Sequence, residues 1–180
     1  EWSVCDEPLA YLTLMTFGLT VQDLADSEKP PKHISDKVDA TLKESELLSG
    51  ALKVTTWGKK MVKLSLSPQE IKLLQQSQKH GCTRTMVGIV AFLKVSDQLF
   101  YKNLGTFCTD EEMKDIWARR RNARLPFGDI HACARLRADV LTLGVKKVAN
   151  FYAANEKLLL EALHHEERIM EVFGKPDKYG

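Results

Sequence analysis

Residues 83–101 are apolar around most of a helical circumference, and this property constrains the fold more than any other stretch of the sequence. The apolar side chains are Met86, Val87, Ile89, Val90, Phe92, Leu93, Leu99 and Phe100. A helix that is apolar on most of its sides has to be covered by other elements. We therefore expect a central core helix over residues 83–101. The chain has 180 residues, of which 44% are hydrophobic, so it is long enough to bury such a helix.

Two capping boxes predict where helices begin. In Ser67-Pro68-Gln69-Glu70, the serine oxygen can accept the amide of the third helical residue, while the glutamate can accept the serine amide. Proline suits the first helical position because that position needs no amide donor. Thr109-Asp110-Glu111-Glu112 offers the same pair of hydrogen bonds. These boxes predict helices from residue 67 toward Gly81 and from residue 109 to about Arg121.

Periodic apolar residues and flanking glycines predict further helices, for about seven in all. They are expected over residues 8–17, in a short helix that begins after Thr20, in a helix capped by Ser35 that ends at Gly50, over residues 129–143, and over residues 145–173 with Gly174 as the stop.

Residues 52–66 change to a period of two, which is typical of a β-hairpin. The alternating side chains are Val54, Thr56, Val62, Leu64 and Leu66, on either side of Trp57-Gly58-Lys59-Lys60. The sequence thus predicts an all-α fold, a helical domain of about seven helices with one β-hairpin.

The chain is long enough for one globular domain over residues 1–180, or for two small lobes. The lobes would be residues 1–66, with the hairpin, and residues 67–180, with the helical core and the basic segment. Pro30-Pro31 predicts a loop or linker, and is a second candidate for a lobe boundary.

The composition indicates a soluble protein with reduced thiols, as in a cytoplasm. No apolar stretch approaches the roughly 18 residues that a membrane span needs. The four cysteines, Cys5, Cys82, Cys108 and Cys133, lack the paired spacing of a zinc site. A domain of this size does not need disulfide bonds for stability.

Positive charge is concentrated in residues 117–147. This segment has eight Lys or Arg residues and two Asp residues, a local charge of +6, whereas the whole chain carries +2. Such a concentration is expected where a protein holds a polyanion, most commonly nucleic acid. The alternative is a solvated charged surface, in which Arg119, Arg120 and Arg121 complement the dipole at a helix end.

Two arginines fall where a helix would otherwise be apolar. Arg120 continues a stripe that includes Met113 and Trp117, and Arg137 lies in the middle of an apolar face of the next helix. A buried guanidinium needs a carboxylate, carbonyl groups or a phosphate as its partner. Arg137 can therefore bind phosphate in a groove or a carboxylate in the core, while Arg135 can pair with Asp139 at i+4.

The candidate RNA-binding residues share a cationic or aromatic side chain in or near this segment. They are Arg119, Arg120, Arg121, Arg124, Arg135, Arg137, Lys146 and Lys147, with Phe127 and Tyr101 as possible stacking partners for bases. Trp117 lies on the apolar stripe, so we expect it in the core.

Residues 119–126, Arg-Arg-Arg-Asn-Ala-Arg-Leu-Pro, resemble the Arg-rich Arg-Asn-Ala-Arg-x-Pro stretch of rhabdovirus nucleoproteins. Those proteins belong to a wider set of helical nucleocapsid and coat proteins that polymerise along viral RNA. The resemblance implies that the stretch contributes to an RNA groove, with Arg121 and Arg124 facing phosphate. It covers eight residues, and where the family continues with acidic residues this chain has Phe127-Gly128. In size and class the chain is equally similar to the helical coat proteins of filamentous plant viruses.

Other chemistry has weaker support in the sequence. Glu161-Ala162-Leu163-His164 has the Glu-x-x-His spacing of di-iron bundles, but such sites need two copies of this motif and the chain has one. Cys108 or Cys133 with His131 could form a nucleophile and base, although buried thiols are commoner. We expect no enzymatic activity, no metal and no cofactor.

These features together lead to a functional hypothesis. We expect an RNA-binding, self-assembling viral nucleocapsid or coat protein that packages single-stranded RNA through backbone contacts. Its partners would be single-stranded RNA and neighbouring copies of itself in a polymer, with no membrane, in the virion and the host cytoplasm. The alternative is a helical protein-interaction module whose basic face docks an acidic partner.

Overall fold

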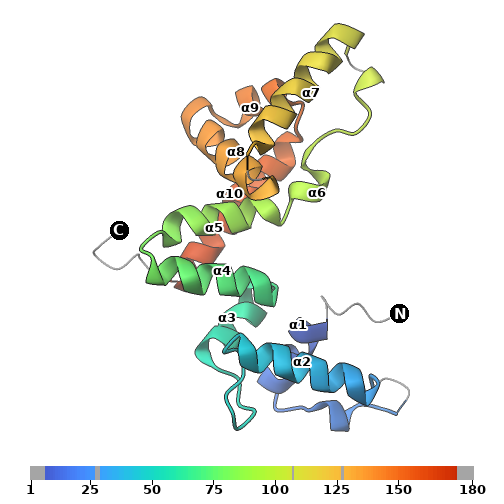
Figure 1. The fold of residues 1–180 in the computed structure, drawn as a ribbon, viewed down its shortest axis with the longest axis vertical. Coiled ribbons are helices and arrows are strands. Elements are labelled where there is room, and N and C mark those ends of the chain that lie inside the picture. The colour runs from blue at the N-terminus through green and yellow to red at the C-terminus, as the bar shows by residue number, and fades with distance from the viewer. Residues whose placement is uncertain (1–6, 27–28, 107, 127, 174–180) are drawn as a thin grey trace. The chain divides into compact units, whose positions relative to one another are not determined.

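The chain folds into helices and divides into two compact units, Glu1–His80 and Gly81–Gly180. The computed structural model describes residues 7–26, 29–106, 108–126 and 128–173. These residues form ten α-helices and two short 3-10 helices, with no β-strand among them (Figure 1). The predicted all-α class is therefore confirmed, whereas the predicted hairpin is wrong.

The first unit packs four α-helices around a small apolar core. Its elements are α1 (Glu7–Thr16), the 3-10 helix η1 (Val21–Asp23), α2 (Lys32–Glu44), α3 (Thr56–Leu64) and α4 (Pro68–Lys79). Helix α1 packs on α2 and α3, and α3 packs on α4. Leu12, Leu42 and Met61 are completely buried.

The second helix of this unit begins earlier than the sequence predicts. It starts at Lys32, after Pro31, and ends at Glu44. Ser35 therefore lies inside the helix and is not its cap. Its hydroxyl is instead within hydrogen-bond distance of the Tyr11 hydroxyl, at 2.9 Å between the oxygens, so it ties α1 to α2.

Helix α3 occupies the segment that was predicted to be a hairpin. The Thr55 hydroxyl caps its first turn by accepting the Gly58 amide at 3.1 Å, and Gly58, Met61 and Leu64 are buried at a helical spacing of three residues. A Cβ at Gly58 would lie 2.5 Å from the Leu47 carbonyl oxygen. Gly58 thus allows close packing of a helix and does not form a hairpin turn, and the pairing left near it is an isolated bridge between Leu48 and Val54.

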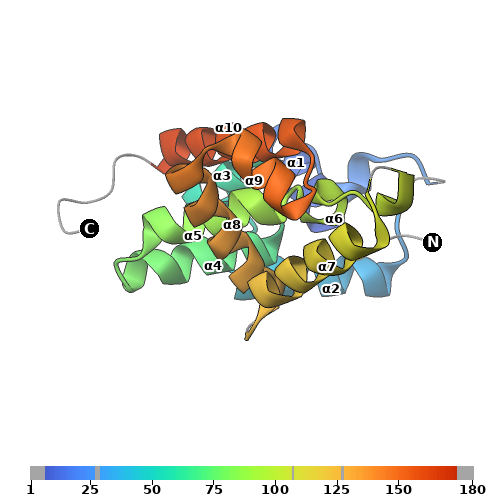
Figure 2. The same cartoon turned by 90° about the horizontal axis from the view of Figure 1, so that it is seen from above.

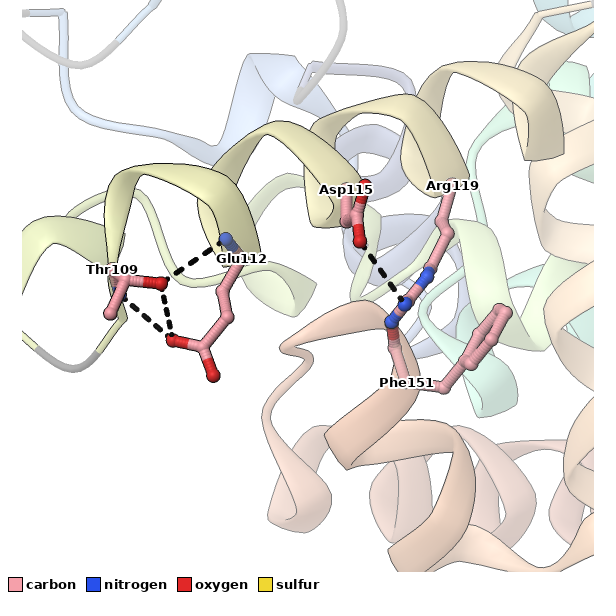
Figure 3. A network of polar contacts seen from close by, with 5 residues as sticks. All are labelled: Thr109, Glu112, Asp115, Arg119 and Phe151. Carbon is pink, nitrogen blue, oxygen red and sulfur yellow. Dashed lines mark hydrogen bonds and ion pairs between the residues drawn. The ribbon is translucent and has the colours of Figure 1, made fainter.

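Both capping boxes form as predicted. The Glu70 carboxylate accepts the Ser67 amide at 2.6 Å, and the Ser67 hydroxyl accepts the Glu70 amide at 3.2 Å. Figure 3 shows the second box, in which Glu112 accepts the Thr109 amide at 2.8 Å. These hydrogen bonds hold the pKa of Glu112 below its usual value. The short turn after Thr20 is the 3-10 helix η1, with Asp23 accepting the Thr20 amide at 2.7 Å.

The second unit is built around α5, which lies alongside α8 and α10 (Figures 1 and 2). Its elements are α5 (Thr83–Leu93), α6 (Ser96–Leu99), η2 (Leu104–Thr106), α7 (Asp110–Arg124), α8 (Asp129–Leu143), α9 (Val145–Tyr152) and α10 (Glu156–Phe173). Every residue of α5 from Val87 to Phe92 is buried. The predicted central helix is therefore present, although it ends at Leu93.

Two predicted long helices are each interrupted, and the break between α9 and α10 pairs with the end of α6 and the residue after it. Residues 83–101 contain a break between α5 and α6, and residues 145–173 contain a break between α9 and α10. An isolated antiparallel bridge joins Phe100 to Ala154. The Asn155 amide also donates to the Leu99 carbonyl at 2.8 Å. The chain is therefore not helical after α6 and between α9 and α10, where these backbone groups pair over a long sequence separation.

The capping box at α4 gives a test of this fold. Replacing Ser67 with Ala removes the hydroxyl that accepts the Glu70 amide, so the free energy of unfolding should fall by about 0.5 to 2 kcal/mol. Urea denaturation followed by circular dichroism measures the change. Ser67→Thr keeps the hydroxyl and should stay close to the unmodified protein; equal losses in both variants would contradict the capping role.

Candidate nucleic-acid interface

Arg120 is buried and is bound by the protein backbone. Its residue is 6% exposed, and its guanidinium donates to the carbonyls of Tyr152 at 2.8 Å, Ala153 at 2.8 Å and Tyr101 at 3.1 Å. Burial lowers the pKa of Arg120 from its ordinary value. The guanidinium thus connects the segment after α6 to the end of α9, and a phosphate would have to compete with three carbonyl groups for it.

Two aromatic rings complete the surroundings of Arg120. Its guanidinium carbon lies 4.7 Å from the Phe100 ring centroid and 5.2 Å from that of Trp117. Both distances are within the range of cation–π attraction. Because Trp117 lies on the same helix as Arg120, this contact also restricts the orientation of the indole.

Arg137 is paired with a carboxylate in the helical core. Its Nε donates to Glu166 at 2.8 Å and its Nη2 donates at 2.6 Å to the other carboxylate oxygen. The two side chains are 15% and 14% exposed, and these hydrogen bonds raise the pKa of Arg137. A Cβ at Gly88 would overlap the arginine side chain. Of the two roles open from the sequence, the geometry is that of a core ion pair between α8 and α10.

Three further arginines contact neighbouring protein groups. Arg135 pairs with Asp139 at 3.4 Å, as its i+4 spacing predicts, and Arg124 pairs with Asp129 at 3.1 Å. Arg119 donates to the Phe151 carbonyl at 3.2 Å and lies 4.5 Å from that ring's centroid (Figure 3). All three guanidinium groups keep access to solvent, and the carboxylates of Asp129 and Asp139 offset part of the local charge.

A pocket of about 410 Å³ in the second unit brings several candidate residues together. Among the residues that line it are Tyr101, Lys102, Trp117, Arg120, Arg121, Arg124 and Asp129. Arg121 and Lys102 are exposed cations, and Tyr101 is 47% exposed. The pocket therefore combines positive charge with aromatic surface.

The remaining candidates lie elsewhere or cannot be placed. Arg119, Arg135, Arg137, Lys146 and Lys147 do not line the pocket, although both lysines are exposed in α9. Phe127 lies outside the described residues. Of the cationic candidates, Arg120, Arg121 and Arg124 are thus the ones that line this pocket.

Sequence reasoning missed two pocket residues, Lys102 and Trp117. Trp117 is 54% exposed, so the prediction that it lies in the core is wrong. The buried residues of α7 are Ile116, Arg120 and Ala123. Trp117 follows Ile116 by one position, which rotates it about 100° around the helix to the edge of the buried face. No periodicity in the sequence distinguishes that edge from the core.

Other reactive side chains show features of structural groups. Burial raises the pKa of the Cys133 thiol to about 12, so its nucleophilic thiolate form is disfavoured at neutral pH. Glu161 lies 3.4 Å from His165, while Glu166 pairs with Arg137. In the parts of the chain that the structure describes, no three His, Cys, Asp or Glu side chains gather as metal ligands would. No described helix is long and apolar enough to cross a bilayer.

A comparison with protein-family models gives no match, and neither does a comparison with curated proteins.

The Arg137–Glu166 pair gives a second prediction. Arg137→Ala would leave a largely buried carboxylate without its partner, and the free energy of unfolding should fall by about 3 to 5 kcal/mol. Thermal and urea denaturation measure the loss. Arg135→Ala is the matched control on the same helix, where an exposed pair contributes at most about 1 kcal/mol.

The double variant Arg137→Met/Glu166→Leu separates pairing from packing. Replacing both charges with apolar groups of similar volume should restore most of the lost stability. If Arg137→Ala folds as stably as the control but loses affinity for RNA, the arginine binds phosphate and the assignment to the core is wrong.

Proposed function

We propose that this chain binds single-stranded RNA through the phosphate backbone and packages it, with neighbouring copies, as a nucleocapsid or coat protein. The observation that carries the proposal is the pocket lined by Lys102, Arg121 and Arg124 beside Tyr101 and Trp117. Proteins usually bind single-stranded nucleic acid through cations that contact its phosphate backbone and aromatic side chains on which its bases stack.

The arginines of the pocket suit phosphate in position and chemistry. Arg121 and Arg124 are three residues apart on α7, so both project from one side of the helix. A guanidinium presents several donors in a plane and can bind a phosphate through two hydrogen bonds. Arg124 also contacts exposed Asp129, a pair that a phosphate can replace at small cost because both partners are hydrated.

Self-assembly has support from exposed apolar side chains on both units. Phe17, Leu19 and Leu52 are exposed in the first unit, and Leu125, Leu141 and Leu143 are exposed in the second. Apolar side chains at the surface can contribute to contacts between subunits, and phosphate binding by many subunits then becomes cooperative along the strand.

Salt dependence of RNA binding tests the proposed site. If three cations of the pocket neutralise phosphates, log affinity for single-stranded RNA should fall with log salt with a slope of roughly −2. Arg121→Ala/Arg124→Ala should reduce the steepness of that slope by about 1.4. Fluorescence anisotropy with a labelled oligouridine measures both, under conditions where one protein binds each strand.

The matched control removes two exposed arginines outside the pocket, as Arg84→Ala/Arg168→Ala. In this variant, the slope of log affinity against log salt should stay close to that of the unmodified protein. A slope near zero in the unmodified protein, or equal losses in both double variants, would argue against the pocket as a phosphate site. Stronger competition by polyglutamate than by RNA would favour the acidic protein partner instead.

Assembly is tested separately by light scattering at micromolar concentration. Addition of long single-stranded RNA should convert the protein into particles much larger than a monomer, because many subunits share one strand. Replacing exposed Leu141 and Leu143 with Ser should reduce particle size while leaving affinity for short oligonucleotides unchanged. A protein that stays monomeric both with and without long RNA would contradict the packaging role.

A further inference from the structure

Trp117 exposes an unusually large part of its side chain for a tryptophan next to a buried helix face. It is 54% exposed and lines the pocket. Tryptophan is a large apolar residue that is highly buried on average. An exposed indole inside a pocket that also holds cations therefore offers a surface for a ligand with a flat, apolar part and a charged part.

The spacing along α7 aligns the indole with the arginines. Trp117, Arg121 and Arg124 follow the i, i+4, i+7 pattern and all line the pocket. Residues at this spacing lie on one face of a helix. The rise from Trp117 to Arg121 is about 6 Å, so one nucleotide can contact the ring with its base and the guanidinium with its phosphate.

A buried cation contacts the indole and restricts its orientation. The guanidinium of Arg120 lies 5.2 Å from the Trp117 ring centroid. Arg120 cannot move easily, because three backbone carbonyls accept its hydrogen bonds. A ring held in this way loses little conformational entropy when a ligand stacks on it. Arg120 covers part of the ring, and the exposed part of Trp117 is available for stacking.

We infer that this pocket binds one unpaired nucleobase stacked on Trp117, with the flanking phosphates on Arg121 and Arg124. The inference rests on the proposed function and narrows its ligand to single-stranded nucleic acid with accessible bases. Tyr101, which also lines the pocket, provides a second aromatic wall. A base in a duplex cannot reach the ring without unpairing, so duplex RNA binds only through its phosphates.

Comparing two strands that differ only in their bases tests the inference. Oligouridine should bind roughly 5- to 150-fold more tightly than an abasic strand of equal length and charge, because each stacked base contributes favourably. Trp117→Leu should abolish this preference, because it removes the ring on which the base of oligouridine stacks. Trp117→Phe should retain part of the preference, and Trp57→Phe in the first unit should retain all of it.

Fluorescence reports the contact directly. The variant Trp2→Phe/Trp57→Phe keeps Trp117 as its single tryptophan, and oligouridine should quench that emission while the abasic strand should not. Circular dichroism of each variant checks that the helices remain folded.

The outcomes distinguish this inference from the proposed function. Equal, salt-dependent binding of both strands would overturn the stacking inference and leave RNA binding through phosphate intact. Absence of binding to either strand would overturn both. If Trp117→Leu changes the oligomeric state but not the preference for bases, the indole contacts another subunit and the inference is wrong.

Discussion

The second unit depends on the hydrogen bonds that buried Arg120 donates to three backbone carbonyls. A buried guanidinium without partners would cost several kcal/mol. The carbonyls at a helix end likewise lack partners within the helix. Tyr152 and Ala153 lie at the end of α9, and Tyr101 follows the end of α6. The hydrogen bonds thus provide partners both for the buried guanidinium and for the carbonyls. They also bring together two chain segments that are far apart in sequence.

The same interaction connects stability to the proposed site. Neighbouring arginines on α7 have different environments because each residue is rotated about 100° from the one before it. Arg120 therefore points into the fold while Arg121 is exposed at the pocket. The buried arginine holds the Trp117 ring and the Tyr101 backbone that form part of the pocket wall. Support of this kind is what a binding site needs in order to keep its shape without a ligand.

Local rules predicted local structure well, and long-range contacts accounted for the errors. The Ser67 and Thr109 capping boxes depend on residues three apart, and both helices begin where predicted. The hairpin was wrong because its alternation was short, and Gly58 is required by packing against Leu47. The break between α9 and α10 lies where Ala154 pairs with Phe100, and the placement of the Arg137 guanidinium depends on Glu166, 29 residues away. The concentration of positive charge in the sequence predicted Arg121 and Arg124 as site residues. The exposure of Trp117 could not be predicted from its position on the apolar stripe that includes Met113.

Pairing within the protein also limits how tightly one subunit can hold a polyanion. Carboxylates outside the basic stretch, Asp115 and Glu166, contact Arg119 and Arg137, and Arg120 is enclosed by backbone. The phosphate contacts available to one pocket are therefore few, and a few hydrated contacts give modest affinity at physiological salt. A chain that packages RNA under this restriction has to gain affinity from many linked sites on one strand. On the proposed function, the apolar surfaces are then as necessary as the arginines, because they raise the effective concentration of each pocket beside the next stretch of RNA.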